Sequence, residues 1–158
     1  LQRGAARVVA IDVGYGQLHN QLRQDERVVV MERQTARHLK RGDLPEELDL
    51  VVIDASFIGL EKLLPSAHAL LRPGGEVLAL VKPQFQVGQD KVGKGGVVRD
   101  PEARRGAIES TIAAAEALGF ELRGQSDCVI TGPKGNQETF IALRRSRSPH
   151  PAEEPSAS

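Results

Sequence analysis

Four charged residues each directly follow a short apolar run, which is where parallel-sheet proteins keep their binding and catalytic groups. A charge beside a buried strand is costly unless it is paired or used, so four such residues are more informative than one. Carboxylates and an amine at one sheet edge can bind hydroxyl groups and move protons. The four residues are Asp12, Glu32, Asp54 and Lys82.

Asp12 fits the binding of a ribose, because one carboxylate can accept hydrogen bonds from both hydroxyls of the sugar. The same residue also fits the N-cap of a helix over Gly14–Leu22. The spacing favours neither role over the other.

Asp54 and Lys82 are expected to meet above the sheet. Asp54 lies 28 residues before Lys82, the length of one strand–helix–strand unit, so their strands are expected to be neighbours. Pro83 keeps Lys82 in extended backbone at the strand exit. The pair is either part of a reactive site or a structural ion pair at the sheet rim, and the sequence leaves both interpretations open.

A long glycine-rich connection from Lys82 to Asp100 is the main candidate for contact with phosphates. Between Lys82 and Arg105, six cations face three anions. Glycines allow close backbone approach, and lysines between them can meet phosphates, although a solvated flexible loop has the same composition. No Gly-Lys-Ser/Thr sequence follows, so nucleoside triphosphate hydrolysis is not supported. The candidate RNA-binding residues are Lys91, Lys94, Arg99 and, in a later turn, Lys134.

The turn Gly132–Asn136 joins two apolar runs, and its residue types are those that any hairpin turn uses. Glu138 is more informative, since it places an acid at the start of an otherwise apolar strand. We therefore treat Glu138 as a further candidate site residue.

The strands that would position these residues are short apolar runs. Four of them are rich in β-branched residues and do not alternate with polar ones, the pattern of parallel strands buried on both faces. Two later runs, near residues 120–130 and 139–143, predict an antiparallel hairpin. We expect a three-layer α/β fold with a mostly parallel sheet. The four runs are Val8–Ile11, Val28–Met31, Leu50–Ile53 and Val77–Val81.

Three helices are expected between the strands. Pro65 kinks the second helix or starts its second half, and the run Arg72–Gly75 ends it. The third helix is the clearest, with Asp100 as its cap and Gly119 at its end. The three helices are expected near residues 17–23, 60–71 and 101–118.

The composition excludes several classes of protein. The 158 residues carry 21 Lys+Arg and 21 Asp+Glu, so any basic site is local rather than a bulk positive charge. Aromatic residues are 3% of the chain, which excludes recognition mainly by aromatic stacking. The single cysteine, Cys128, excludes a disulfide framework and a cysteine-rich zinc site. With no membrane-length apolar run and no signal peptide, we expect a cytoplasmic protein.

The composition changes at Arg144, where a run of Arg and Ser leads into Pro, Ala, Glu and Ser. We therefore expect a folded domain over residues 1–143 and a disordered tail over residues 144–158.

Five segments together closely resemble the TlyA (haemolysin A) family. Members of that family are ribosomal RNA cytidine 2′-O-methyltransferases with an FtsJ-like catalytic domain. The resemblance covers about residues 1–143, in order and without a large gap. The segments are Asp12–Leu18, Asp54–Ile58, Leu80–Phe85, Lys94–Asp100, and Gly132–Asn136 with Glu138.

The resemblance implies a Rossmann-like methyltransferase fold, S-adenosylmethionine as cofactor, no metal, and ribosomal RNA within the ribosomal subunits as partner. It implies a catalytic set of the order Lys-Asp-Lys-Glu, whose last three members are Asp54, Lys82 and Glu138. It also implies which residues bind the cofactor, with Asp12 on the ribose and Glu32 near the adenine. The cofactor-binding residues are Asp12, Val13, Glu32, Arg33 and Asp54.

Parts of the family pattern are not found in this sequence. They are an S4-like RNA-binding domain, the central first strand, the glycine-rich cofactor loop and the first catalytic lysine. We therefore expect an N-terminally truncated copy of the FtsJ-like domain, inactive as this fragment. Two alternatives remain: a non-catalytic RNA-binding remnant that uses the loop Lys91–Arg105, and a membrane-active haemolysin. No long apolar or strongly cationic amphipathic segment supports the second alternative.

Overall fold

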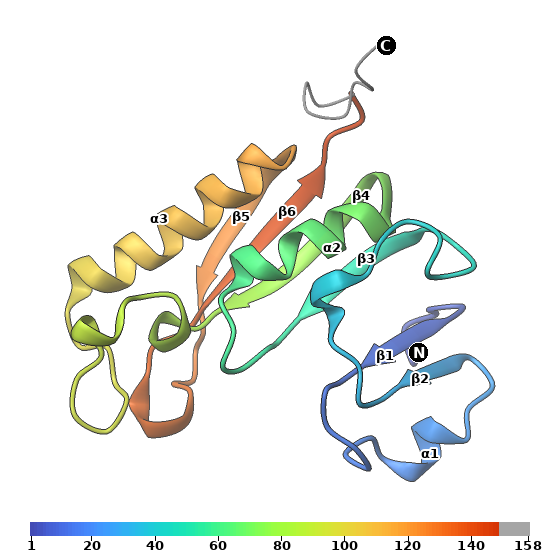
Figure 1. Cartoon of the computed structure of the whole chain (residues 1–158), viewed down its shortest axis with the longest axis horizontal. Helices are drawn as coiled ribbons and strands as arrows, with labels where there is room; N and C mark the ends of the chain where they lie inside the picture. Colours follow the sequence, from blue (N-terminus) through green and yellow to red (C-terminus); the bar gives the residue numbers. More distant parts are fainter. Residues whose placement is uncertain (149–158) are drawn as a thin grey trace. The chain divides into compact units, whose positions relative to one another are not determined.

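The computed structural model describes residues 1–148 (Figure 1). By its internal contacts the chain divides into two compact units, residues 1–39 and residues from 40 onward. The strands form two separate sheets, one of two strands and one of four.

The first unit contains a pair of parallel strands, β1 (Val8–Ile11) and β2 (Val28–Met31). Their register pairs Ile11 with Met31, so both strands end at the same edge. Between them lies the single-turn helix α1 (Asn20–Arg23), which is shorter than expected. Its cap is His19, whose ring nitrogen accepts a hydrogen bond from the backbone N–H of Gln21.

The second unit contains a mixed sheet of strand order β3-β4-β6-β5. Strand β3 (Leu48–Ile53) runs parallel to β4 (Leu71–Val81), and β6 (Thr139–Arg145) runs antiparallel to β4. Strand β5 (Phe120–Asp127) pairs antiparallel with β6 at the sheet edge. The expected terminal antiparallel hairpin is therefore confirmed, whereas the expected mostly parallel sheet has only one parallel pair among these four strands.

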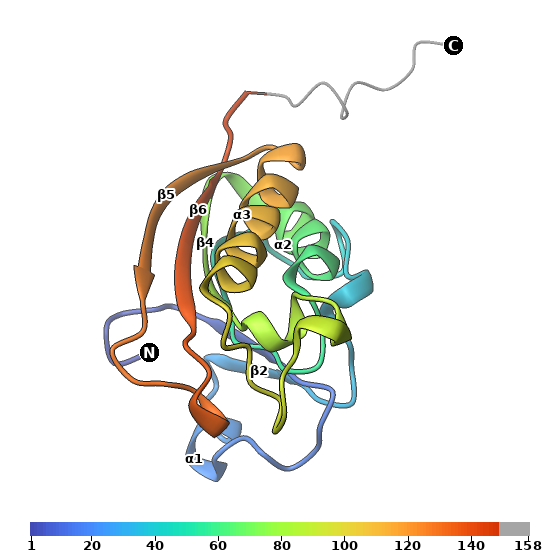
Figure 2. The same ribbon diagram turned by 90° about the vertical axis from the view of Figure 1, so that its left-hand side faces the viewer.

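Two helices cover one face of this sheet, α2 (Leu64–Leu70) and α3 (Pro101–Ala117), and Figure 2 shows them on the same side. Pro65 lies in the first turn of α2, where its missing N–H costs nothing, so it starts the second half of the expected helix. The first half is the 3₁₀ turn Leu60–Lys62. Helix α3 begins as expected, with the Asp100 carboxylate accepting a hydrogen bond from the N–H of Glu102.

The core lies between these helices and the sheet. Arg145 is buried among the core residues, and its guanidinium donates hydrogen bonds to the carbonyls of His68 and Leu71 at 2.9 and 2.6 Å. These bonds attach the end of β6 to the end of α2. The largest buried apolar side chains are Leu64, Leu71, Ile141, Leu143, Val77 and Val81.

The opposite face of the four-stranded sheet is exposed. Leu50 is 55% exposed and Val52 is 65% exposed, and Leu78 and Phe140 are also exposed. The expectation that the strands are buried on both faces is wrong for β3 and β4, because the described helices of this unit cover only one face. Apolar runs of this kind indicate a strand but do not indicate what covers it.

Two boundaries also differ from expectation. Strand β4 begins at Leu71 because a first pairing with β3 joins Leu48 to Leu71, before the register jumps to Leu50 and Glu76. Strand β6 continues through Arg145, beyond the expected domain end at residue 143. Residues 149–158 of the expected tail lie outside the described part of the chain.

We expect Leu64→Ala to lower the free energy of unfolding by about 2–5 kcal/mol, because it removes a fully buried side chain and leaves a cavity. Urea denaturation with an unchanged slope would measure this. The matched control is Leu50→Ala on the uncovered face, with an expected change of about 0.5 kcal/mol or less. Equal losses in the two variants would contradict the described core.

Candidate active site

Lys82 lies at the carboxyl edge of the four-stranded sheet beside Asp54. Strands β3 and β4 are parallel neighbours that end at Ile53 and Val81, so the next residue of each emerges at the same edge. The Lys82 Nζ lies 2.7 Å from the Asp54 Oδ1, as the strand order predicts. The lysine side chain is 13% exposed and the aspartate 66%, so the ammonium is largely enclosed while the carboxylate faces solvent.

Ser56 is a second partner of the lysine. The Lys82 Nζ donates a hydrogen bond to the Ser56 Oγ at 3.2 Å. Ser56 belongs to the loop that follows β3, two residues after Asp54. One short segment therefore orients the amine through two oxygen acceptors.

Glu138 lies on the other side of Lys82. The β4–β6 register pairs Val81 with Thr139, and one further step along both strands sets Lys82 opposite Glu138. Glu138 is 7% exposed, and its Oε1 has no hydrogen-bond partner among residues 1–148. A buried carboxylate oxygen without a partner is costly, so this atom is available to a cation or a donor hydroxyl.

Gly132 makes room for the Glu138 carboxyl group. A Cβ built on Gly132 would overlap the carboxyl atoms of Glu138. The hairpin turn therefore needs a glycine there for space as well as for turn geometry. The sequence alone indicates only that the turn favours a glycine.

Cys128 lies near the carboxylates of this edge. Burial raises the pKa of its thiol, and the negative charges of Glu138, Asp127 and Asp54 raise that pKa further. Its backbone N–H also donates to the carbonyl of Glu138 at 2.9 Å. The pKa of the thiol therefore depends on two of the three candidate catalytic residues, Glu138 and Asp54.

Asp12 and Glu32 lie together in the first unit, at the ends of β1 and β2. The Asp12 Oδ1 accepts a hydrogen bond from the backbone N–H of Gly14 at 2.7 Å. This bond forms a local turn, and α1 has His19 as its cap, so the alternative of Asp12 as a helix cap is wrong.

Glu32 is held by two donors. The Arg23 guanidinium bonded to it holds the pKa of the carboxyl below its ordinary value, against the effect of burial, and the N–H of Gly16 at 3.1 Å adds to this. The next residue, Arg33, has a positive φ of 53° and places its guanidinium 4.4 Å from the centre of the Tyr15 ring. Val13, the residue after Asp12, is largely exposed.

The glycine-rich loop is joined to the hairpin turn by Asn136, which is almost completely buried. Its amide donates to the carbonyl of Gly96 at 2.9 Å and accepts from the N–H of Val98 at 3.0 Å. This clamp brings Arg99 and Lys134 to one hollow. Lys91 and Lys94 belong to the same loop but do not line that hollow.

Several residues at this edge carry no clear signal in the sequence. Phe57 is 89% exposed with a positive φ of 63°, a conformation that is strained for a bulky residue, and its ring lies 5.1 Å from that of Phe85. Arg104 bonds to Asp127 and Thr139. Ser56 and Phe57 lie within the segment Asp54–Ile58, which is one of the five that resemble the family. No feature of the sequence indicates Arg104.

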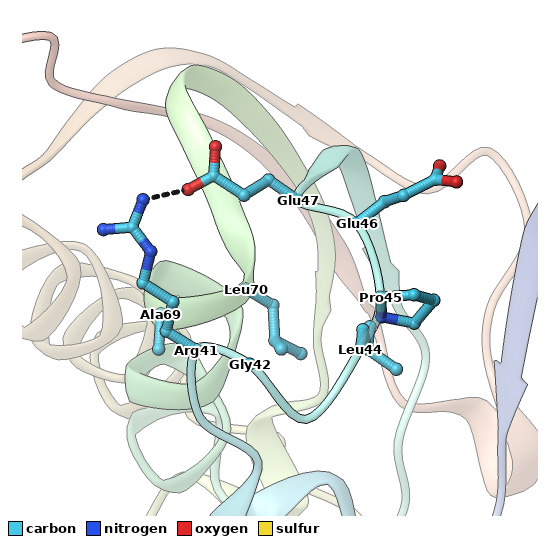
Figure 3. Close-up of a pocket in the computed structure, with 8 residues that line it drawn as sticks. All are labelled: Arg41, Gly42, Leu44, Pro45, Glu46, Glu47, Ala69 and Leu70. Atoms are coloured by element: carbon cyan, nitrogen blue, oxygen red, sulfur yellow. Dashed lines mark hydrogen bonds and ion pairs between the residues drawn. The ribbon is translucent and has the colours of Figure 1, made fainter.

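A different hollow, of about 230 Å³, lies by the amino end of β3 (Figure 3). An ion pair between Arg41 and Glu47 crosses its rim. Sites in parallel sheets lie at the carboxyl ends of the strands, so this hollow is not the candidate site.

No helix within residues 1–148 combines the length and the apolar character that crossing a membrane requires.

The chain matches the FtsJ-like methyltransferase family over residues 1–145. The 16S/23S rRNA (cytidine-2′-O)-methyltransferase TlyA of Mycobacterium tuberculosis is 46% identical over 144 residues, which are 91% of this chain and 54% of that protein. The chain thus spans about half the length of the curated relatives it matches.

Solved structures show the same likeness. A Streptococcus thermophilus protein described as a hemolysin has a TM-score of 0.88 at 40% identity, covering 94% of this chain and 54% of that chain. The N-methyltransferase NodS of Bradyrhizobium japonicum, in complex with S-adenosyl-L-homocysteine, has a TM-score of 0.59 at 14% identity, covering 88% of this chain and 66% of that chain. At that identity the likeness to NodS shows the fold alone.

Alkylation of Cys128 tests whether the carboxylates gather at this edge. We expect Glu138→Gln and Asp54→Asn each to speed the reaction with iodoacetamide at pH 8, by roughly twofold or more, because a lost negative charge lowers the pKa of the thiol and the thiolate is the reactive form. Cys128 is the only cysteine, so mass spectrometry reports it directly. Glu121→Gln on β5 is the control, and rates equal to the control in both variants would refute the arrangement.

Proposed function

The chain belongs to the FtsJ-like methyltransferase family, and within it to the TlyA type, and from this premise we propose that it is the catalytic part of an enzyme that methylates ribose 2′-hydroxyls in ribosomal RNA. The methyl donor is S-adenosylmethionine, and the target is a cytidine, as in the names of the relatives. The substrate is part of the ribosomal subunits, so the reaction takes place in the cytoplasm.

One observation carries this proposal. A largely enclosed lysine amine lies at the carboxyl edge of the sheet, 2.7 Å from Asp54, and the neighbouring strand β6 begins at the same edge just after Glu138, whose Oε1 is buried without a partner among the described residues. A site that takes a proton from a hydroxyl group needs an amine held in place and acceptors that direct its hydrogens. This edge supplies both.

The reaction needs a proton acceptor. The cofactor would supply a methyl group carried on a sulfonium sulfur. The ribose oxygen would accept this methyl group from the sulfonium, which would become a sulfide, and the hydroxyl proton would pass to the Lys82 Nζ. Lys82 is therefore the proposed proton acceptor.

Asp54 and Glu138 act by orienting the amine. Asp54 and Ser56 accept two of its hydrogens, which directs the remaining position of Nζ away from β3. We propose that the free Oε1 of Glu138 binds either Nζ or the ribose hydroxyl when the substrate arrives. Holding oxygen, carbon and sulfur in line supplies much of the rate enhancement in such a transfer.

The carboxylates of the first unit have the chemistry to bind the cofactor. The ribose of S-adenosylmethionine has two hydroxyl donors, and the Asp12 carboxylate at the end of β1 can accept from both. We propose that Asp12 binds the ribose, and that Glu32, Val13 and Arg33 surround the adenine.

The basic loop and turn would contact the RNA backbone through Lys91, Lys94, Arg99 and Lys134. The same residues support the alternative function of a non-catalytic RNA-binding protein. Cofactor binding distinguishes the two functions, because only the enzyme requires it.

We expect Lys82→Ala to lower methyl transfer to ribosomal RNA by about 100-fold or more, since general acid–base catalysis is typically worth about 10²–10⁴. The assay follows labelled methyl groups from S-adenosylmethionine. Two proteins are assayed, this chain and a fusion. In the fusion, the part of the M. tuberculosis relative that precedes the matched region is joined ahead of Leu1. We expect methyl transfer only in the fusion. Lys62→Ala, on the turn before α2, is the control, and near-normal transfer by Lys82→Ala would end this assignment.

We expect Asp12→Ala in the same fusion to weaken S-adenosylmethionine binding by about tenfold, the loss of roughly one charge-assisted hydrogen bond. Isothermal titration calorimetry measures the dissociation constant. Asp43→Ala is the control in the loop before β3. If the unsubstituted fusion binds no cofactor but binds RNA, the non-catalytic alternative is correct.

A further inference from the structure

A hollow of about 410 Å³ in the second unit gathers positive charge beside the candidate active site. The end of the glycine-rich loop, the start of α3 and the hairpin turn before β6 form its walls. Its charged lining residues are Arg99, Arg104, Lys134 and Asp100.

Two of the three cations of this hollow, Arg99 and Lys134, have no carboxylate partner among residues 1–148, whereas Arg104 is paired with Asp127. Arg99 donates to the carbonyl of Lys94 at 3.4 Å. Asp100, the one carboxylate of the lining, accepts a hydrogen bond from the N–H of Glu102 as the cap of α3. The hollow therefore carries an excess of positive charge.

Arg104 is held in a fixed orientation. Its Nη2 bonds to the Asp127 carboxylate and, at 3.2 Å, to the Oγ1 of Thr139, which is itself 2.8 Å from the Asp127 Oδ1. The Arg104 Nε is buried and has no hydrogen-bond partner among the described residues. Guanidinium N–H groups that are fixed in one orientation at a hollow are suited to bind a phosphate.

Helix α3 adds to this field. It is 17 residues long, and its first turn, with Asp100, Pro101 and Arg104, lines the hollow. The N-terminus of such a helix carries a partial positive charge that favours a phosphate. The helix supports a site that the three cations define.

The hollow adjoins the catalytic edge through β6. Gln137 lines it, and the next residue is Glu138. Thr139, which bonds to Arg104, pairs with Val81, the residue before Lys82. A phosphate in the hollow would therefore belong to the same strand of RNA as a ribose at Lys82.

We propose that this hollow binds one phosphodiester of the RNA substrate through Arg99, Arg104 and Lys134, and so sets the position of the target ribose along the strand. The proposal rests on the proposed function for the identity of the nucleic acid. The sequence did not indicate Arg104 as an RNA contact. Lys91 and Lys94, which it did indicate, do not line this hollow.

The first experiment measures RNA affinity against salt concentration. The full chain is titrated with a ten-nucleotide single-stranded RNA, and the double variant Arg99→Gln/Lys134→Gln is compared with it. We expect the variant to bind about tenfold more weakly at low salt, with a salt slope smaller by about 0.7, the value for one lost phosphate contact on a single strand.

The matched control removes the same charge elsewhere. Arg123→Gln/Lys62→Gln changes one exposed arginine on β5 and one exposed lysine before α2, neither of which lines the hollow. We expect its affinity within twofold of the unsubstituted chain. Equal weakening in both double variants would show a general charge effect and overturn the proposal.

The second experiment tests the hollow itself with inorganic phosphate, followed by NMR. We expect phosphate to shift the Arg104 Nε–H signal and the backbone amide of Gln137 in the unsubstituted chain, and not in Arg99→Gln/Lys134→Gln. No shift in the unsubstituted chain would overturn the proposal. Phosphate binding without any effect of the variant on RNA affinity would overturn RNA as the source of the phosphate.

Both experiments are independent of methyl transfer. Failure of the proposed function would therefore appear as a chain that binds RNA through the hollow but transfers no methyl group in the fusion. Failure of the phosphate site would appear as unchanged RNA affinity in the double variant of an active enzyme.

Discussion

The pairing of β4 with a parallel neighbour on one side and an antiparallel neighbour on the other determines the candidate site. Parallel pairing brings the end of β3 to the end of β4, and antiparallel pairing brings the start of β6 to the same place. Asp54, Lys82 and Glu138 therefore emerge at the same edge of the sheet although the first and the last are 84 positions apart in the chain. A change of direction in either neighbour would carry one acid to the far edge of the sheet.

The lysine at this edge is not explained by stability. An ion pair with one largely exposed carboxylate typically contributes about 0–1 kcal/mol. This gain is small beside the free-energy cost of removing an enclosed amine from water. The buried, unpartnered Oε1 of Glu138 adds a further cost. An edge that retains such groups is suited to binding a substrate that pairs with them, which supports the proposed proton transfer.

A second constraint links the candidate site at the end of β4 to the hollow lined by Arg99, Arg104 and Lys134. Asn136 bonds to the backbone of the glycine-rich loop at two points, and two residues later the chain reaches Glu138. Arg104 bonds to Thr139 on the other side of Glu138. The start of β6 is thus held by the loop and by α3 together, and the groups proposed to bind a phosphate share their supports with a group proposed to act on the ribose.

The sequence alone predicts most of the elements and indicates the candidate residues, because apolar runs, capping residues and charges at strand ends are local features. It placed Lys82 beside Asp54 correctly, since a strand–helix–strand unit makes parallel neighbours. It did not show that one face of β3 and β4 is exposed, because Leu50 and Val52 look the same whether or not a helix covers them. Nor did it single out Asn136, Arg104 or the space at Gly132, since each depends on groups distant in the chain. Local propensity and composition are properties of neighbouring residues, whereas burial, unpartnered atoms and converging charges arise only when separate segments pack together, so only the tertiary structure could decide them.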